Sequence, residues 1–190
     1  MPVEMDEALE EAYASAPADE FVLCTLEIQH PAFVDPDGNA DSLRAVTNDK
    51  RAWDLKIEAD APMFAGETKT FEPCAVEVIG PEQDEASLGQ MRLKIDNVPQ
   101  RYMRHLTAAA TMSSPIRVIY REYLLNHDPE TGEWTVASTD GPAYRIGGLT
   151  MKAVDATMLV LEGVAGFVDA LGQSAPTEVF SREDYPGIWQ

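Results

Sequence analysis

The sequence predicts a mainly β protein of the α+β class, built as one domain over residues 1–190. Three observations lead to this prediction. Short apolar or alternating runs recur at a spacing of roughly ten residues, which is typical of an antiparallel sandwich or barrel. Turn-forming sequences rich in Gly, Pro, Asn and Asp separate these runs. Only two segments have helical spacing, and no internal repeat or Ser/Gly-rich linker marks a second domain.

The first element is a predicted amphipathic helix within residues 1–16. Met5, Leu9 and Tyr13 recur at helical spacing, acidic residues occupy the opposite face, and Pro17 ends the pattern. Its apolar stripe is narrow, so the helix must dock on the rest of the protein or on a neighbouring subunit to persist.

A β core is expected over residues 21–164. Its first strand is mostly apolar and is closed by His30-Pro31, and the strand at 91–95 alternates cleanly between apolar and polar residues. A second helix is expected near residues 98–110, where Val98, Tyr102 and Leu106 have helical spacing. The predicted strands are 21–28, 43–47, 53–57, 70–79, 91–95, 116–125, 134–136, 144–154 and 157–164, the last two broken by Gly147-Gly148.

The C-terminal tail, residues 175–190, is polar until its last six residues, and we expect it to dock as well. The Asp35–Asn39 segment has oxygen ligands at alternate positions, as a calcium loop does. Its glycine stands at the fourth loop position instead of the sixth, and Val46 replaces the closing glutamate, so a turn is expected there.

Charge and cysteine content exclude several classes of protein. With 14 basic and 33 acidic residues the net charge is −19, which argues against a general nucleic-acid binder. Two cysteines, Cys24 and Cys74, are too few for a disulfide scaffold or a thiolate metal site. Both are expected to be buried, and the sequence does not decide whether they form one disulfide between adjoining strands. The acidic N-terminus is unlike a secretory signal, and no apolar run is long enough to span a membrane.

No catalytic pattern emerges. His30, His105 and His127 are isolated, and the sequence has neither a nucleophile elbow nor a phosphate-binding glycine loop. We therefore expect neither an enzyme nor a bound cofactor or metal.

The distribution of charge is more informative than its sum. Residues 1–90 hold 21 acidic and 5 basic residues, a net charge of −16, whereas residues 91–121 carry a net charge of +5 and residues 122–190 one of −8. The basic side chains either offset neighbouring acids within one fold or form a face that docks an acidic face of another copy or a partner. The candidate interface residues are Arg92, Lys94, Arg101, Arg104, Arg117 and Arg121.

The order of these features resembles the minor-tail and tail-tip proteins of long-tailed bacteriophages, and is similar to the N-terminal part of the phage lambda tail-tip protein L. The segments that carry the resemblance are residues 21–31, 71–75, 91–97, 115–124 and 185–188.

The resemblance implies an antiparallel β-barrel or split barrel of the tail-tube type, assembled as a ring of three or six copies. It also implies a structural role at the tail tip of the virion, after assembly in the host cytoplasm, with tail tube, distal tail, tape-measure and hub proteins as neighbours. It transfers no catalytic residue. The cysteine-rich, cluster-binding part of the lambda protein has no counterpart here, so no iron–sulfur cofactor is carried over.

Two other readings of the sequence remain. In a soluble ligand-binding β-barrel, Trp53, Tyr120, Trp134 and Tyr144 would line a cavity, although core packing is the more frequent use of such rings. An uncharacterised hydrolase has no supporting constellation. In a tail-tip ring the excess acids would line the lumen and let DNA slide past; otherwise they keep a β-rich protein soluble.

Overall fold

The computed structural model describes residues 7–15, 17–79, 90–96, 105, 109, 114–156 and 160–167. Within these residues the protein is mainly β, as the sequence predicts, and the helix at its N-terminal end is α1 (Glu7–Ser15). The strands are β1 (Glu20–Val34), β2 (Ala40–Val46), β3 (Trp53–Lys56), β4 (Thr68–Pro73), β5 (Val76–Ile79), β6 (Gln90–Asp96), β7 (Arg117–His127), β8 (Trp134–Val136), β9 (Tyr144–Ala156) and β10 (Val160–Phe167).

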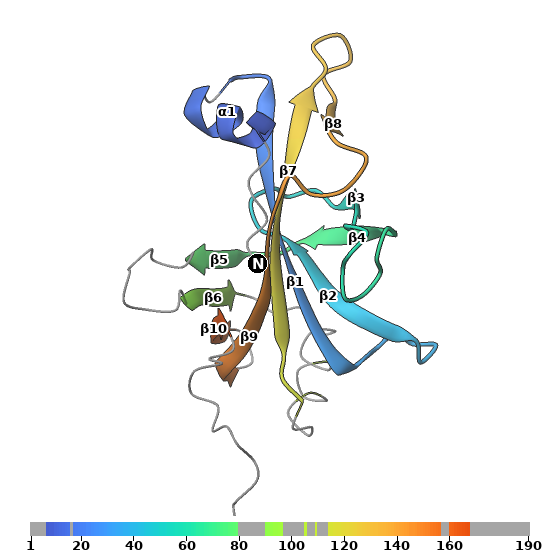
Figure 1. Cartoon of the computed structure of the whole chain (residues 1–190), viewed down its shortest axis with the longest axis vertical. Coiled ribbons are helices and arrows are strands. Elements are labelled where there is room, and N and C mark those ends of the chain that lie inside the picture. Colours follow the sequence, from blue (N-terminus) through green and yellow to red (C-terminus); the bar gives the residue numbers. More distant parts are fainter. Residues whose placement is uncertain are drawn as a thin grey trace, which may run out of the picture.

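All ten strands belong to one mixed sheet (Figure 1). Its order is β3-β4-β2-β1-β7-β9-β10-β6-β5, with β8 paired to the far end of β7. Two parts of the predicted antiparallel barrel are therefore wrong. Strands β2 and β4 pair in parallel, through only two residue pairs, and the sheet is not closed, since the end strands β3 and β5 do not pair with each other.

The sheet is nevertheless strongly curled. Strand β4 lies near one end of the strand order and β5 at the other, yet only Cys74 and Ala75 separate them in the chain. Three residue steps span at most about 11 Å, so β5 must lie close to β4. The backbone N–H of Cys74 also donates to the Val46 carbonyl at the end of β2, at 3.0 Å. The two ends of the sheet are thus brought together by chain connection, without a continuous backbone ladder.

Each face of the sheet carries its own hydrophobic core. The inner cluster lies inside the curl, gathers side chains from strands at both ends of the sheet, and includes Leu26, Ile28, Val118 and Leu149. The outer cluster lies on the opposite face, beneath β3 and β4, and contains Leu23, Val46, Leu55, Ile57, Phe71, Tyr123 and Leu125. Because successive side chains of a strand point to opposite faces, β1 and β7 contribute to both clusters.

Three predicted boundaries differ from the structure for local reasons. Strand β1 continues past His30-Pro31 to Val34, with an irregular register there, and the His30 Nδ1 accepts the Ala32 N–H at 3.1 Å. A proline is tolerated at such an irregularity because one ladder bond is already missing. The expected strand at 70–79 is divided into β4 and β5. Gly147-Gly148 does not end a strand but lies within β9, where the register with β7 shifts and Gly148 has φ 78°.

The helix α1 lies beside the end of the sheet where β1 begins and β7 ends (Figure 1). It docks as expected, because Leu9 is fully buried and Ala12 is 7% exposed. Of the helix expected near residues 98–110 only His105 and Ala109 are described, and both are helical. The tail at 175–190 lies outside the described residues. No helix in the described part of the chain has the length and apolar character needed to cross a membrane.

Candidate functional site

The outer face of β1 carries a buried polar stripe. Thr25, Glu27 and Gln29 alternate with the apolar residues of the inner cluster, so a solvent-facing stripe would be the ordinary outcome. Instead Thr25 and Glu27 are fully buried and Gln29 is 3% exposed. The chain that follows β3 crosses over this face and brings Glu58 against the stripe.

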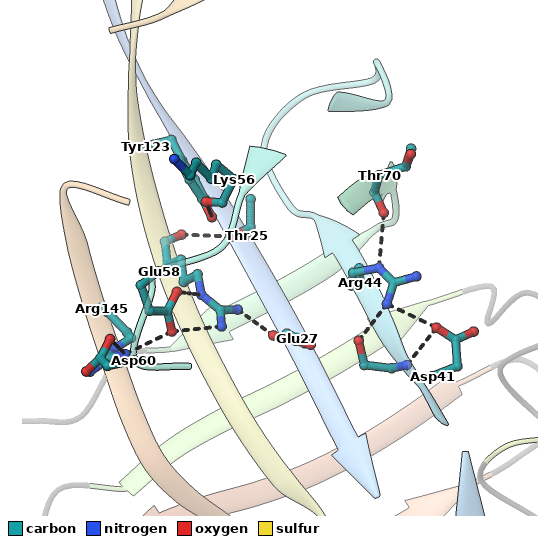
Figure 2. Close-up of polar contacts among 12 residues, drawn as sticks. Thr25, Glu27, Asp41, Arg44, Lys56, Glu58, Asp60, Thr70, Tyr123 and Arg145 are labelled. Carbon is teal, nitrogen blue, oxygen red and sulfur yellow. Dashed lines mark hydrogen bonds and ion pairs between the residues drawn. The ribbon is translucent and has the colours of Figure 1, made fainter. Parts of the chain in front are cut away.

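An arginine from β7 satisfies these acids. Glu58 and Glu27, both labelled in Figure 2, accept hydrogen bonds from the guanidinium of Arg121. The Arg121 Nε and one terminal nitrogen donate to the two carboxylate oxygens of Glu58, at 2.6 and 3.0 Å, in the bidentate geometry that suits a guanidinium. The other terminal nitrogen donates to the Glu27 Oε2 at 2.6 Å. The Arg121 and Glu27 side chains are both 0% exposed.

A second arginine extends the network to the surface. Arg145, on β9, donates to the Glu58 Oε1 at 2.9 Å and to both carboxylate oxygens of Asp60, each at 2.9 Å. The Tyr123 hydroxyl donates to the Lys56 carbonyl at 3.0 Å. These contacts join the end of β3 to β7 and β9 through side chains, where no backbone ladder exists. We call Glu27, Glu58, Asp60, Arg121 and Arg145 the arginine clamp.

The electrostatics of the clamp keep Glu58 and Arg121 charged. Burial alone would raise the pKa of Glu58, but hydrogen bonds and charge from Arg121, then Arg145, outweigh it and hold this pKa below its ordinary value. Although burial acts to lower the pKa of Arg121, its bonds to Glu58 and Glu27 raise it. Neither Glu58 nor Arg121 is therefore poised to exchange a proton near neutral pH, and the donors of both arginines are used within the chain. This arrangement is suited to holding a shape.

A smaller polar cluster fills the notch where β2 and β4 diverge (Figure 2). The Arg44 Nε donates to the Thr70 carbonyl at 3.3 Å, one terminal nitrogen donates to the Ser42 hydroxyl at 2.8 Å, and the same nitrogen pairs with Asp41 at 3.0 Å. A cavity of about 70 Å³ lies beside it. Its lining consists of Asp41, Ser42, Leu43, Arg44, Thr70, Glu72 and His105.

The inner face carries a different polar cluster at the end of the curl beneath α1. Glu122 of β7 lies between Cys24 of β1 and Tyr144 of β9 in the strand register. The Tyr120 hydroxyl donates to the Glu122 Oε1 at 2.8 Å. Tyr13 of α1 lies near the same carboxylate, since burial, followed by the charge of Glu122 and a side-chain hydrogen bond with it, raises the pKa of Tyr13. We call Tyr13, Cys24, Tyr120, Glu122 and Tyr144 the mouth cluster.

The six candidate interface residues fall into three groups. Arg121 is fully buried and paired with acids of its own chain, so it is not part of an exposed basic face. For this residue the other interpretation is confirmed, in which basic side chains offset acids within one fold. Arg92 and Arg117 are exposed, and Lys94, with its side chain 44% exposed, lies 4.0 Å from Glu162. Arg101 and Arg104 lie outside the described residues.

The four aromatic residues proposed to line one cavity lie on both faces of the sheet. Trp53 and Trp134 pack against the outer cluster, whereas Tyr120 packs against the inner one. A surface groove of about 420 Å³ is lined by none of them; its residues are Thr47, Asn48, Asp49, Lys50, Pro73, Cys74 and Ala75.

The remaining candidates have local structural roles. The Asp35 carboxylate accepts the backbone N–H groups of Asp37 and Asn39, at 2.9 and 2.8 Å, which is the expected turn. Cys24 and Cys74 are not joined by a disulfide, and both are partly exposed where burial was expected. Among the described residues, no group of three or more His, Cys, Asp or Glu side chains could hold a metal ion.

Sequence reasoning missed Glu27, Glu58, Asp60 and Arg145. The one local signal was Glu27, an acid in the otherwise apolar run at 21–28. The residues of the clamp are far apart in sequence. Arg121 lies 94 residues from Glu27 and 63 residues from Glu58.

Residues 8–180 match the domain of unknown function DUF1833, which covers most of the chain. The protein therefore belongs to the DUF1833 family, a phage-associated family. None of the curated proteins compared with the chain matches it.

Proposed function

We propose that this protein is a structural component of the virion of a long-tailed phage, and that it forms a ring at the distal tail or tail tip. In this role it joins the tail tube to the tip proteins, as the N-terminal domain of the lambda tail-tip protein L would by resemblance. The curled sheet then corresponds to a split barrel of the tail-tube type. Its copies assemble in the host cytoplasm and remain in the virion.

The observation that carries this proposal is the open sheet. Within the described residues β5 pairs on one side only, with β6, so it presents backbone donors and acceptors along its other edge. Natural proteins cover such edges, because an unpaired edge associates with other chains. The opposite end strand, β3, also pairs on one side only, with β4, but the chain that follows it is tied to β7 and β9 by the arginine clamp. A chain with one fastened end and one open end is suited to head-to-tail contact, and head-to-tail contacts close into rings.

Charge placement supports the same arrangement. Arg92 and Arg117 are exposed in a segment of net charge +5, whereas the rest of the chain is strongly acidic. Complementary faces of this kind steer and register subunits more than they add affinity. We place Arg92 and Arg117 between subunits and the excess of acids toward the bore, where carboxylates repel DNA phosphates. Tail tube, distal tail, tape-measure and hub proteins are the proposed neighbours.

Sedimentation velocity of the purified full chain over a hundredfold concentration range tests the proposal. The proposal predicts a discrete species of three or six copies, seen as closed rings by negative-stain electron microscopy. A monomer at every concentration, with and without the co-expressed neighbouring tail proteins, would contradict it.

A further inference from the structure

Glu122 is the one carboxylate of the mouth cluster. Glu122 is 7% exposed, and its Oε1 atom accepts a hydrogen bond from the Tyr120 hydroxyl at 2.8 Å. The Oε2 atom is buried and has no hydrogen-bond partner. No ion pair involving Glu122 is formed by the described residues.

Other buried acids of this sheet are treated differently. Glu27 and Glu58, on the outer face, both pair with Arg121, the residue that directly precedes Glu122. A buried carboxylate without a cation is costly, because desolvation is not repaid by a nearby opposite charge. Among the described residues, the buried acids on one face of β7 are therefore paired with a cation, whereas Glu122 on the other face is not.

The groups around Glu122 are neutral acceptors and donors. Burial raises the pKa of Tyr120, and the neighbouring Cys24 and Glu122 raise it further. The pKa of the Cys24 thiol is also raised, chiefly by burial, and that of Tyr144 is raised by burial and then by the charge of Glu122. Phenol oxygens keep acceptor lone pairs when protonated, so they can share the donors of a cation held by the carboxylate.

We propose that the mouth cluster is a binding site for one organic cation, a guanidinium or alkylammonium group, which the Glu122 Oε2 receives. The source is either an arginine of a second copy of this chain or a free small cation. The first source rests on the proposed ring, and the exposed Arg92 and Arg117 supply its chemistry. The second source is independent of the ring.

Access to the site runs past α1. This helix has nine residues and buries only Leu9 and Ala12, and Tyr13, at the rim of the cluster, is 53% exposed. We place the approach to Glu122 at this rim, where α1 leaves Tyr13 half exposed. The ends of curled sheets and barrels are common places for ligands to bind.

The test uses the full chain labelled with 3-fluorotyrosine and followed by ¹⁹F NMR during titration with methylguanidinium chloride. Sodium chloride at equal ionic strength is the reference. The proposal predicts a saturable shift of tyrosine resonances and a rise in Tm. In Glu122→Gln the Kd for methylguanidinium should rise about tenfold or more, since a hydrogen bond to a charged group contributes about 1.5–3 kcal/mol. The matched control is Glu130→Gln, an exposed acid at the β7–β8 turn, which should bind as the unaltered chain does.

Two results would overturn the proposal. One is a response to methylguanidinium no larger than that to sodium chloride. The other is equal binding by the Glu122→Gln and Glu130→Gln variants. A Glu122→Gln variant with a higher Tm and no cation response in either form would identify Glu122 as a buried neutral acid.

Sedimentation separates the two sources and separates this proposal from the ring. If methylguanidinium dissociates the assembly, and Glu122→Gln assembles more weakly, the cation comes from a second copy. If methylguanidinium binds while assembly is unchanged, or while the chain is monomeric, the cation is a free ligand. Binding of methylguanidinium by a chain that is monomeric would contradict the ring and still support the cation site.

Discussion

Replacing Arg121 with methionine should destabilise the protein more than any other single change on the outer face. The variant removes the two bonds to Glu58 and the one to Glu27, and it leaves both carboxylates in place. Glu27 is fully buried and its Oε1 already has no partner, so no solvent compensates the lost cation. Removing one partner of a buried ion pair costs about 3–5 kcal/mol.

The expected change is large enough to measure by thermal and urea unfolding. For a domain of this size each kcal/mol lowers Tm by about 2–4 °C, so the midpoint should fall by about 6–20 °C. The matched control is Arg117→Met, which lies on the same strand and is exposed, and which should change stability by about 0.5 kcal/mol or less.

A second variant keeps this prediction testable if Arg121→Met does not fold. Converting Glu27 and Glu58 to glutamine in the Arg121→Met background removes the uncompensated charges and should recover much of the loss, since the cost lies in the stranded acids. The reasoning is refuted if Arg121→Met is no less stable than Arg117→Met, or if the triple variant is the least stable of the three.

Three further predictions concern the surface, the pH response and one glycine. Charge reversal of Arg92 and Arg117 to glutamate should abolish self-association and leave the circular dichroism spectrum nearly unchanged; unaltered sedimentation would remove both from the interface. Because the pKa of folded Glu58 is lowered, its stabilisation is complete above the ordinary value of 4.5 and is lost as the pH falls through the folded value. Unfolding at decreasing pH should show this acid loss, and Glu58→Gln should reduce it. Gly141 has φ 142°, and a Cβ there would lie 3.4 Å from the Glu58 Cα, so Gly141→Ala should lower Tm more than Gly148→Ala, where φ is also positive and the space is open.

Local patterns predicted most of the strands. The alternation at Met91, Leu93 and Ile95 places these residues in the inner cluster, as the sequence indicates, and the hairpin signature at Asp128–Gly132 leads into β8 as expected. Such signals are local because side-chain period and turn chemistry depend on neighbouring residues.

The order of the strands could not be predicted in the same way. The parallel pairing of β2 with β4 rests on two residue pairs, and the Cys74-Ala75 connection brings the two ends of the open sheet together. Neither feature has a periodic signature in the sequence. An antiparallel barrel was the simpler expectation, and it was wrong in the pairing and in the closure.

The candidate sites show the same division. Arg121 was placed on an exposed basic face because neighbouring arginines and lysines share its charge, whereas its burial depends on Glu58, which reaches it through a loop 63 residues away. For the same reason, an assembly test that reverses both Arg117 and Arg121 would unfold the chain, and Arg92 is the better partner for Arg117. Glu122 could not be recognised from its neighbours, because the burial of its unpartnered Oε2 atom depends on the pairing of β1, β7 and β9.

Gold labelling of phage particles with antibodies against this protein tests the central claim most directly. Virions made by host cells that carry the gene should be labelled at the distal end of the tail, and particles from a strain lacking the gene should be tailless or should lack the tip. Label confined to the cell lysate, with intact and infective particles from the deleted strain, would contradict a structural role in the tail.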